Sequence, residues 1–289
     1  KDSLSMRTVW EDAKGTARKN VAPLSLVISA FAPVPDVRRV LTPDLKPETG
    51  SHLLLIDLGH SRNRLGSSIL AQAYSQIGDT GPDVDAHDLR RLYEAVQQLL
   101  RDDLVLAYHD RSDGGLLATL CEMAFGGRRG LRVDVGSLGP DPLASLFAEE
   151  ISVVLQVGTA ALQAARRVLE AHSLAGSTHD LGTVADAGNL RIEIAHDADV
   201  VLDRPVLELQ QVWSELTHQM QRRRDNPACA DEEFGALADT ADPGLSFELT
   251  FPMPEVAAPA VATTRPRVAI LREQGINGQI EMGAAFDAA

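Results

Sequence analysis

The sequence predicts an α+β fold in which helices pack in layers on a mixed sheet. Strand-like apolar runs and helix-patterned runs recur through residues 24–224, but they do not alternate one for one, which argues against a doubly wound parallel sheet. Of the 289 residues, 44% are hydrophobic and 24% are charged, so the chain has ample apolar material for a core. Its length indicates roughly two domains.

The expected elements follow from the spacing of apolar residues. Continuous or alternating apolar runs predict strands at 24–31, 52–58, 104–107, 131–135, 151–157, 178–184 and 190–195. Apolar residues at helical spacing predict helices at 66–77, 88–100, 116–125, 142–147, 160–172 and 205–224. Three arginines, 222–224, end the last helix and complement its dipole.

The composition changes after residue 224. Residues 225–264 are rich in Pro, Ala, Asp and Glu, which predicts a linker with one short strand at 245–251. A strand at 267–271, a polar turn at 272–278 and a helix from 279 then predict the first βα unit of a new domain. Because the chain begins at Lys1 without methionine and ends inside this helix pattern, we expect it to be a piece of a longer polypeptide.

Charge and cysteine usage narrow the possible functions. A formal net charge of -14 makes nucleic-acid binding a poor candidate, because that function rewards basic surfaces. No apolar run is long enough to span a membrane, and no signal peptide is visible. The two cysteines are too few for a disulfide framework: Cys121 is expected as a buried structural thiol, and Cys229 falls in the linker. A cytoplasmic location is expected.

Residues 109–115 are the most distinctive polar segment, and two interpretations fit them. Asp110 and Asp113 are hard oxygen ligands suited to Mg²⁺, while Ser112 and the N–H groups of Gly114 and Gly115 can hold phosphate oxygens at a helix start. Alternatively, Ser112 or Asp113 caps the helix and the glycines make the turn. Spacing alone favours the cap.

Other polar segments allow a functional and a plain interpretation each. Residues 1–6 suit a phosphate site or an exposed terminus, and the second is favoured on physical grounds. Glu149 and Glu150 precede a buried strand as ligands or bases, or, more commonly, as a solvated corner. Residues 273–278 line a ligand crevice or form an ordinary βα turn.

Six segments occur in a fixed order along the chain. They are Lys-Asp-Ser-Leu-Ser-Met (1–6), Pro-Leu-Ser-Leu-Val-Ile-Ser-Ala-Phe (23–31), Tyr-His-Asp-Arg-Ser-Asp-Gly-Gly-Leu (108–116), Leu-Phe-Ala-Glu-Glu (146–150), Met-Gln-Arg-Arg-Arg-Asp-Asn-Pro (220–227) and Leu-Arg-Glu-Gln-Gly-Ile-Asn (271–277). Together they resemble one known family, that of the large, single-chain phosphoribosylformylglycinamidine synthases of purine biosynthesis. The resemblance covers essentially the whole chain, although any one segment also suits relatives in the aminoimidazole ribonucleotide synthetase superfamily.

The resemblance implies an ATP- and glutamine-dependent ligase that converts formylglycinamide ribonucleotide to the amidine. ATP activates the substrate amide oxygen, and ammonia released from glutamine displaces the phosphate, with Mg²⁺ neutralising the phosphates. The small-molecule substrates are these three, and the remaining partner is the rest of the same chain. The implied domains are the end of a synthetase-like N-terminal subdomain (1–45), its α+β C-terminal partner (46–205), a helix and linker (206–264), and the start of a class I glutaminase domain (265–289).

The same resemblance assigns roles within residues 109–115. It implies that Asp110 is a magnesium ligand and that Ser112 contacts the ATP or ADP, with Asp113, Gly114 and Gly115 close by. The other magnesium ligands would precede residue 1.

The resemblance also implies that no catalytic residue lies within this chain. The glutaminase nucleophile would lie beyond residue 289, so neither Cys121 nor Cys229 takes that role, and the chain is expected to be inactive alone.

Two rival functions stay open on the sequence alone. One is another ATP-dependent member of the superfamily, a kinase or synthetase complete in itself, although the unfinished βα unit argues against it. The other is a non-catalytic half that binds ADP structurally and never turns over.

Overall fold

The computed structural model describes residues 7–12, 14–21, 29, 31–34, 36, 40–78, 80–239, 248–251, 267–272, 275 and 277–288. They belong to two units, Lys1–Ala238 and Asp239–Ala289. Residues 1–6, most of the strand predicted at 24–31, and Glu273, Gln274 and Ile276 lie outside the described residues.

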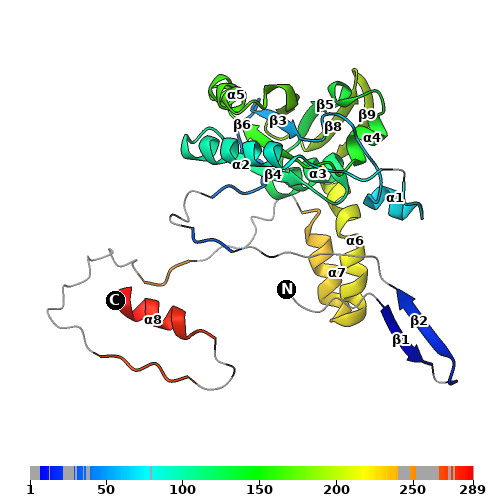
Figure 1. The fold of residues 1–289 in the computed structure, drawn as a ribbon, viewed down its shortest axis with the longest axis vertical. Coiled ribbons are helices and arrows are strands. Elements are labelled where there is room, and N and C mark those ends of the chain that lie inside the picture. The colour runs from blue at the N-terminus through cyan, green and yellow to red at the C-terminus, as the bar shows by residue number, and fades with distance from the viewer. Residues whose placement is uncertain are drawn as a thin grey trace. The chain divides into compact units, whose positions relative to one another are not determined.

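A seven-stranded mixed sheet forms the centre of the larger unit (Figure 1). All neighbouring strands are antiparallel except β5 and β8, which are parallel. The predicted α+β class with a mixed sheet is therefore confirmed. In spatial order the strands are β4 (Ala107–Arg111), β6 (Ser152–Val157), β3 (His52–Asp57), β7 (Thr178–Val184), β5 (Leu131–Asp134), β8 (Arg191–His196) and β9 (Asp199–Pro205).

Helices cover both faces of this sheet. Leu53 and Leu55 of β3 pack in one core cluster with the residues of α3, whereas Leu54 and Ile56 pack in a second cluster with residues of α2 and α5. Because successive strand residues point to opposite faces, a strand buried on both sides is a continuous apolar run, as residues 53–56 are. The helices are α1 (Ile69–Ala73), α2 (Ala86–Arg101), α3 (Gly115–Gly127), α4 (Pro142–Phe147), α5 (Leu162–Ala171) and α6 (Val206–Arg224).

The strand expected at 104–107 lies further along the chain. Its first residue, Leu104, donates its N–H to Leu99 O and so belongs to the turn that ends α2. The ladder of β4 with β6 instead pairs Ala107 with Gln156 and Arg111 with Ser152. Because β4 is an edge strand, polar residues can occupy it without being fully buried. The helix expected at 66–77 is also shorter, since only α1 forms there.

Several elements were not predicted from the sequence. A hairpin joins β1 (Arg7–Glu11) and β2 (Ala17–Val21) through a turn in which the Asp12 carboxylate accepts from the N–H of Lys14 and Thr16. Strand β9 pairs with β8. Helix α7 (Pro227–Ala236) lies within the predicted linker and packs on α6, where the rings of His218 and Phe234 stack 4.2 Å apart.

The two cysteines lie in different surroundings. Cys121 is buried in the core, as predicted, and burial raises the pKa of its thiol to about 12. Cys229 is exposed, but it lies in α7 rather than in a linker.

The smaller unit contains α8 (Gln279–Ala288), in agreement with the predicted helix. Residues 267–272 form no strand, and neither do the described residues 248–251, so these two strand predictions are wrong where they can be tested. A strand needs a hydrogen-bonded neighbour, and the described residues of this unit supply none. Within the described part of the chain, no helix combines the length and the apolar character needed to cross a membrane.

Candidate functional site

The polar segment 109–115 occupies the junction of β4 and α3. His109, Asp110 and Arg111 are the last three residues of the edge strand, Ser112 to Gly114 form the turn, and the helix begins at Gly115. The sequence predicted a loop for all of them. The difference matters because successive residues of a strand point to opposite faces of the sheet, which separates the Arg111 side chain from that of Asp110.

Arg111 forms a buried ion pair across two strands. In the ladders Arg111 is paired with Ser152 of β6, and Ser152 with Asp57 of β3, so these side chains share one row and one face. The guanidinium passes the small Ser152 side chain and donates from Nη2 to Asp57 Oδ1 over 2.8 Å. The Arg111 and Asp57 side chains are 0% and 2% exposed. Arg111 therefore ties the polar segment to the centre of the sheet.

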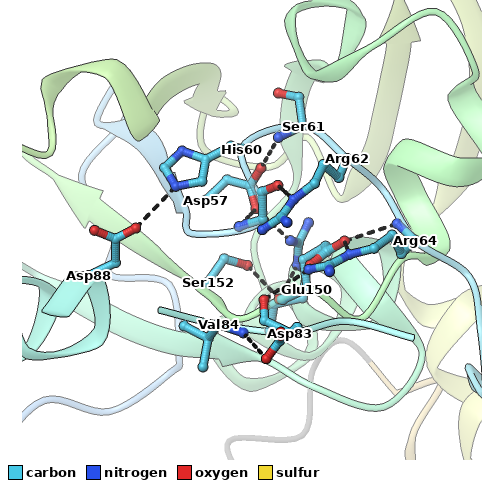
Figure 2. Close-up of polar contacts among 12 residues, drawn as sticks. Asp57, His60, Ser61, Arg62, Arg64, Asp83, Val84, Asp88, Glu150 and Ser152 are labelled. Carbon is cyan, nitrogen blue, oxygen red and sulfur yellow. Dashed lines mark hydrogen bonds and ion pairs between the residues drawn. The ribbon is translucent and has the colours of Figure 1, made fainter. Parts of the chain in front are cut away.

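Asp57 also organises the loop that follows β3. Its Oδ1 accepts from the N–H of Gly59 over 3.0 Å, and its Oδ2 accepts from the N–H of Ser61 over 2.7 Å (Figure 2). His60 and Ser61 both have positive φ, 52° and 56°, a conformation that costs free energy in residues with side chains. The Asp57 carboxylate thus holds a strained loop in place.

Glu150 is fully buried, so the solvated corner favoured from the sequence is wrong for this residue. Arg64 donates to it from its backbone N–H and from Nε and Nη2, over 3.0, 2.8 and 2.7 Å (Figure 2). Burial alone raises the pKa of Glu150, but the hydrogen bonds from Arg64 outweigh it and hold the pKa below its ordinary value. The Cβ of any larger residue at Gly59 would lie 2.6 Å from Glu150 Cγ, which explains the glycine.

The backbone of Glu150 completes the surroundings of Arg111. Its carbonyl oxygen accepts from Arg111 Nε over 2.8 Å. Burial lowers the pKa of Arg111, and the charges of Asp57 and Glu150 oppose this effect. A guanidinium stays protonated in proteins in any case. Four charged groups, on Asp57, Arg64, Arg111 and Glu150, therefore form two linked ion pairs where strands β3 and β4 end.

The turn itself depends on its two glycines. Gly114 and Gly115 have φ of 85° and 70°, and a Cβ on Gly115 would lie 2.7 Å from Leu146 O. Gly114 is the N-cap residue of α3, and no side chain caps this helix, so the predicted cap by Ser112 or Asp113 is wrong. The glycine turn that accompanied it is confirmed.

Both glycine amides already have acceptors in the protein. Gly114 donates to Glu149 Oε1 over 2.9 Å, and Gly115 donates to Ser112 O over 3.0 Å. In this arrangement these two N–H groups are not directed at a phosphate, which goes against one of the two interpretations of the sequence.

The exposed groups of the segment are Asp110, Ser112 and Asp113. The Asp110 side chain is 67% exposed, and its Oδ1 lies 3.8 Å from His109 Nδ1. The other ring nitrogen of His109, Nε2, lies 3.0 Å from Glu122 Oε2 on α3, which fixes this end of the edge strand to the helix. Asp110 and Ser112 thus face solvent beside a rigid, buried network.

A metal ion at this place would need ligands besides those of the segment. No group of three or more His, Cys, Asp or Glu side chains that could hold a metal occurs among the described residues. Mg²⁺ suits the chemistry of Asp110 nevertheless, because it is commonly bound by one or two carboxylates together with phosphate oxygens and water.

The fold and this junction define the class of protein: an α+β domain that places a polar strand-to-helix turn at a sheet edge. Residues 48–195, just over half of the chain, match the C-terminal domain of AIR synthase related proteins. The chain therefore belongs to the AIR synthase related family. Residues 1–33 match the FGAR-AT PurM_N-like domain.

Solved structures give weaker likenesses. PurL of Thermotoga maritima complexed with ATP is 15% identical with a TM-score of 0.47, and the match covers 59% of this chain and 27% of that one. The same protein complexed with FGAR is 15% identical with a TM-score of 0.48, and the match covers 60% of this chain and 30% of that one. The hydrogenase maturation protein HypE in complex with ATP is 16% identical with a TM-score of 0.42, and the match covers 58% of this chain and 54% of that one. The chain thus spans less than a third of these two PurL chains.

Proposed function

We propose that this chain contributes one side of a Mg²⁺–nucleotide site in a phosphoribosylformylglycinamidine synthase. In this proposal Asp110 is a magnesium ligand and Ser112 contacts ATP or ADP, with Asp113, Gly114 and Gly115 forming the adjacent turn. The proposal is supported by the family membership, by the match of residues 1–33 to an FGAR-AT domain, and by the chemistry of the turn.

One observation carries the assignment to side chains rather than to amides. The N–H groups of Gly114 and Gly115 are taken by acceptors within the protein, while the Asp110 and Ser112 side chains face solvent at the start of α3. Carboxylate and hydroxyl oxygens at this place suit a metal-bound phosphate, and the positive end of the helix dipole favours the anion.

The proposed reaction is the ATP- and glutamine-dependent conversion of formylglycinamide ribonucleotide to the amidine. ATP phosphorylates the amide oxygen of the substrate and leaves as ADP. Ammonia from glutamine then attacks the amide carbon, and the oxygen leaves with the phosphate. Mg²⁺, when bound, neutralises the phosphates during the transfer. The residues of this chain hold and orient the nucleotide, and the glutaminase nucleophile belongs to a part of the enzyme that the chain does not contain.

The test is an activity assay on the full-length enzyme that carries this chain. Asp110→Asn should lower amidine formation roughly 10–100-fold, the range typical of damage to a metal site, while the melting temperature stays unchanged. Asp186→Asn, at an exposed turn elsewhere in the same domain, is the matched control and should leave turnover unaltered.

Normal turnover in Asp110→Asn would remove Asp110 from the reaction. If the variant also lost thermal stability, the nucleotide held here would be a structural one.

A further inference from the structure

Glu149 connects two turns that are far apart in the sequence. A single carboxylate oxygen, Oε1, accepts from the N–H of Gly114 and from the N–H of Ile69, each over 2.9 Å. The first amide belongs to the turn between β4 and α3, and the second opens α1. Hydrogen bonds from amides to a carboxylate are about twice as strong as those between neutral groups, so this oxygen fastens both turns.

The next residue links the same two regions by a different route. Glu150 binds Arg64 through its side chain (Figure 2). Its backbone carbonyl accepts from Arg111. Two successive residues therefore hold the segment 57–69 against the segment 111–115. Of the two, Glu149 is only half-buried, and it contacts the backbone of the turn directly, next to the exposed Asp113.

The segment held in this way lines a pocket. The pocket has a volume of about 480 Å³, and its walls include Arg64, Leu70, Tyr74, Thr80 and Leu143. Asn63 and Ser67, on either side of Arg64, have positive φ of 47° and 61°. Such strained conformations persist only where surrounding contacts enforce them, so breaking the hydrogen bond at Ile69 should change the shape of this wall.

We propose that Glu149 is a positioning residue that transmits the state of the β4–α3 turn to the pocket wall. If the turn moves when a nucleotide phosphate binds, the shared oxygen must follow Gly114 or release it, and in either case the bond to Ile69 changes. Glu149 itself does not touch the nucleotide. This inference rests on the proposed function for its nucleotide and on the two hydrogen bonds of Glu149 for the link.

Hydrogen exchange on the full-length protein tests the link first without nucleotide. Glu149→Ala should speed exchange at Gly114 and at Ile69 together, by about tenfold or more, because both amides lose a charged acceptor. Glu149→Gln keeps an acceptor oxygen but loses its charge, so its exchange rates at both amides should fall between those of wild type and Glu149→Ala. Glu170→Ala, at an exposed position of α5, is the control. Faster exchange at only one of the two amides in Glu149→Ala contradicts a shared anchor.

The second arm adds Mg²⁺ and ATP to the same proteins. In wild type and Glu149→Gln, exchange at residues 112–114 and at 69–71 should both change, whereas in Glu149→Ala only residues 112–114 should respond. If exchange in wild type changes only at residues 112–114, the proposal that Glu149 transmits the change is wrong, while the proposal of nucleotide binding stands. If neither segment responds in wild type, the proposed function fails and the transmission fails with it, while the nucleotide-free comparison still decides whether Glu149 anchors both turns.

Discussion

Asp110 and Arg111 are neighbours in one strand, yet they belong to different parts of the molecule. The Arg111 side chain is 0% exposed and reaches past β6 to Asp57 on β3. The Asp110 side chain is 67% exposed and points to the other face of the strand. The alternation of a β-strand produces this separation. Polar residues that look alike in a sequence motif therefore divide into those that hold the turn and those that are free to bind a ligand.

The largest expected difference between the two residues is in stability. Arg111→Ala leaves the Asp57 carboxylate buried without its partner, so the free energy of unfolding should fall by about 3–5 kcal/mol. Asp110→Ala removes an exposed group and should change it by less than ~0.5 kcal/mol. Urea unfolding followed by circular dichroism measures both. Equal effects of the two substitutions would abolish the distinction drawn between them.

A smaller effect is expected at Ser152, which Arg111 passes on its way to Asp57. Ser152→Leu places a bulky side chain in the row and should destabilise the domain by about 1–3 kcal/mol, because the guanidinium must move. Ser152→Ala keeps the space open and loses only the hydroxyl bond to Glu150 O, at about 1 kcal/mol. If the leucine variant proved as stable as the alanine variant, the guanidinium would not depend on this row.

The smallest expected effect is on the dependence of stability on pH in acid. The pKa of Glu150 is lower in the folded protein than its ordinary value of 4.5, so this group stabilises the fold above about pH 4.5 and loses that contribution as the pH falls through the lowered value. Glu150→Gln should therefore flatten the dependence of stability on pH below about pH 4.5. Glu170→Gln serves as the exposed control, and an unaltered slope in Glu150→Gln would argue against the ion pair with Arg64.

Much of the fold could be predicted from the local spacing of apolar residues. The buried strands at 52–58 and 151–157 and the amphipathic helix at 88–100 were predicted within a few residues, because burial on one or both faces fixes the spacing of apolar residues. The short hairpin at the start and α7 were missed. Both are short and largely exposed, so they carry no buried apolar pattern. They rest on turn and cap contacts, such as the Asn226 side chain accepting from Ala228 N–H.

The candidate site was only half predictable, for a different reason. Sequence chemistry singled out Asp110, Ser112 and the glycines. It could not assign Arg111 to Asp57 or Glu150 to Arg64, because these partners are 54 and 86 residues apart. The first pair meets through the sheet register, and the second meets through loops beside the strands. The misplaced start of β4 had the same origin, since an edge strand is defined by its ladder rather than by its apolar residues.

The central claim is that the exposed part of the segment binds a magnesium nucleotide while the buried part holds the turn. A titration of ATP into the full-length protein, with and without Mg²⁺, tests it most directly. Asp110→Ala should weaken Mg²⁺-dependent binding by roughly tenfold or more and leave the unfolding curve unchanged. Wild-type affinity and wild-type Mg²⁺ dependence in a stably folded Asp110→Ala protein would contradict the account.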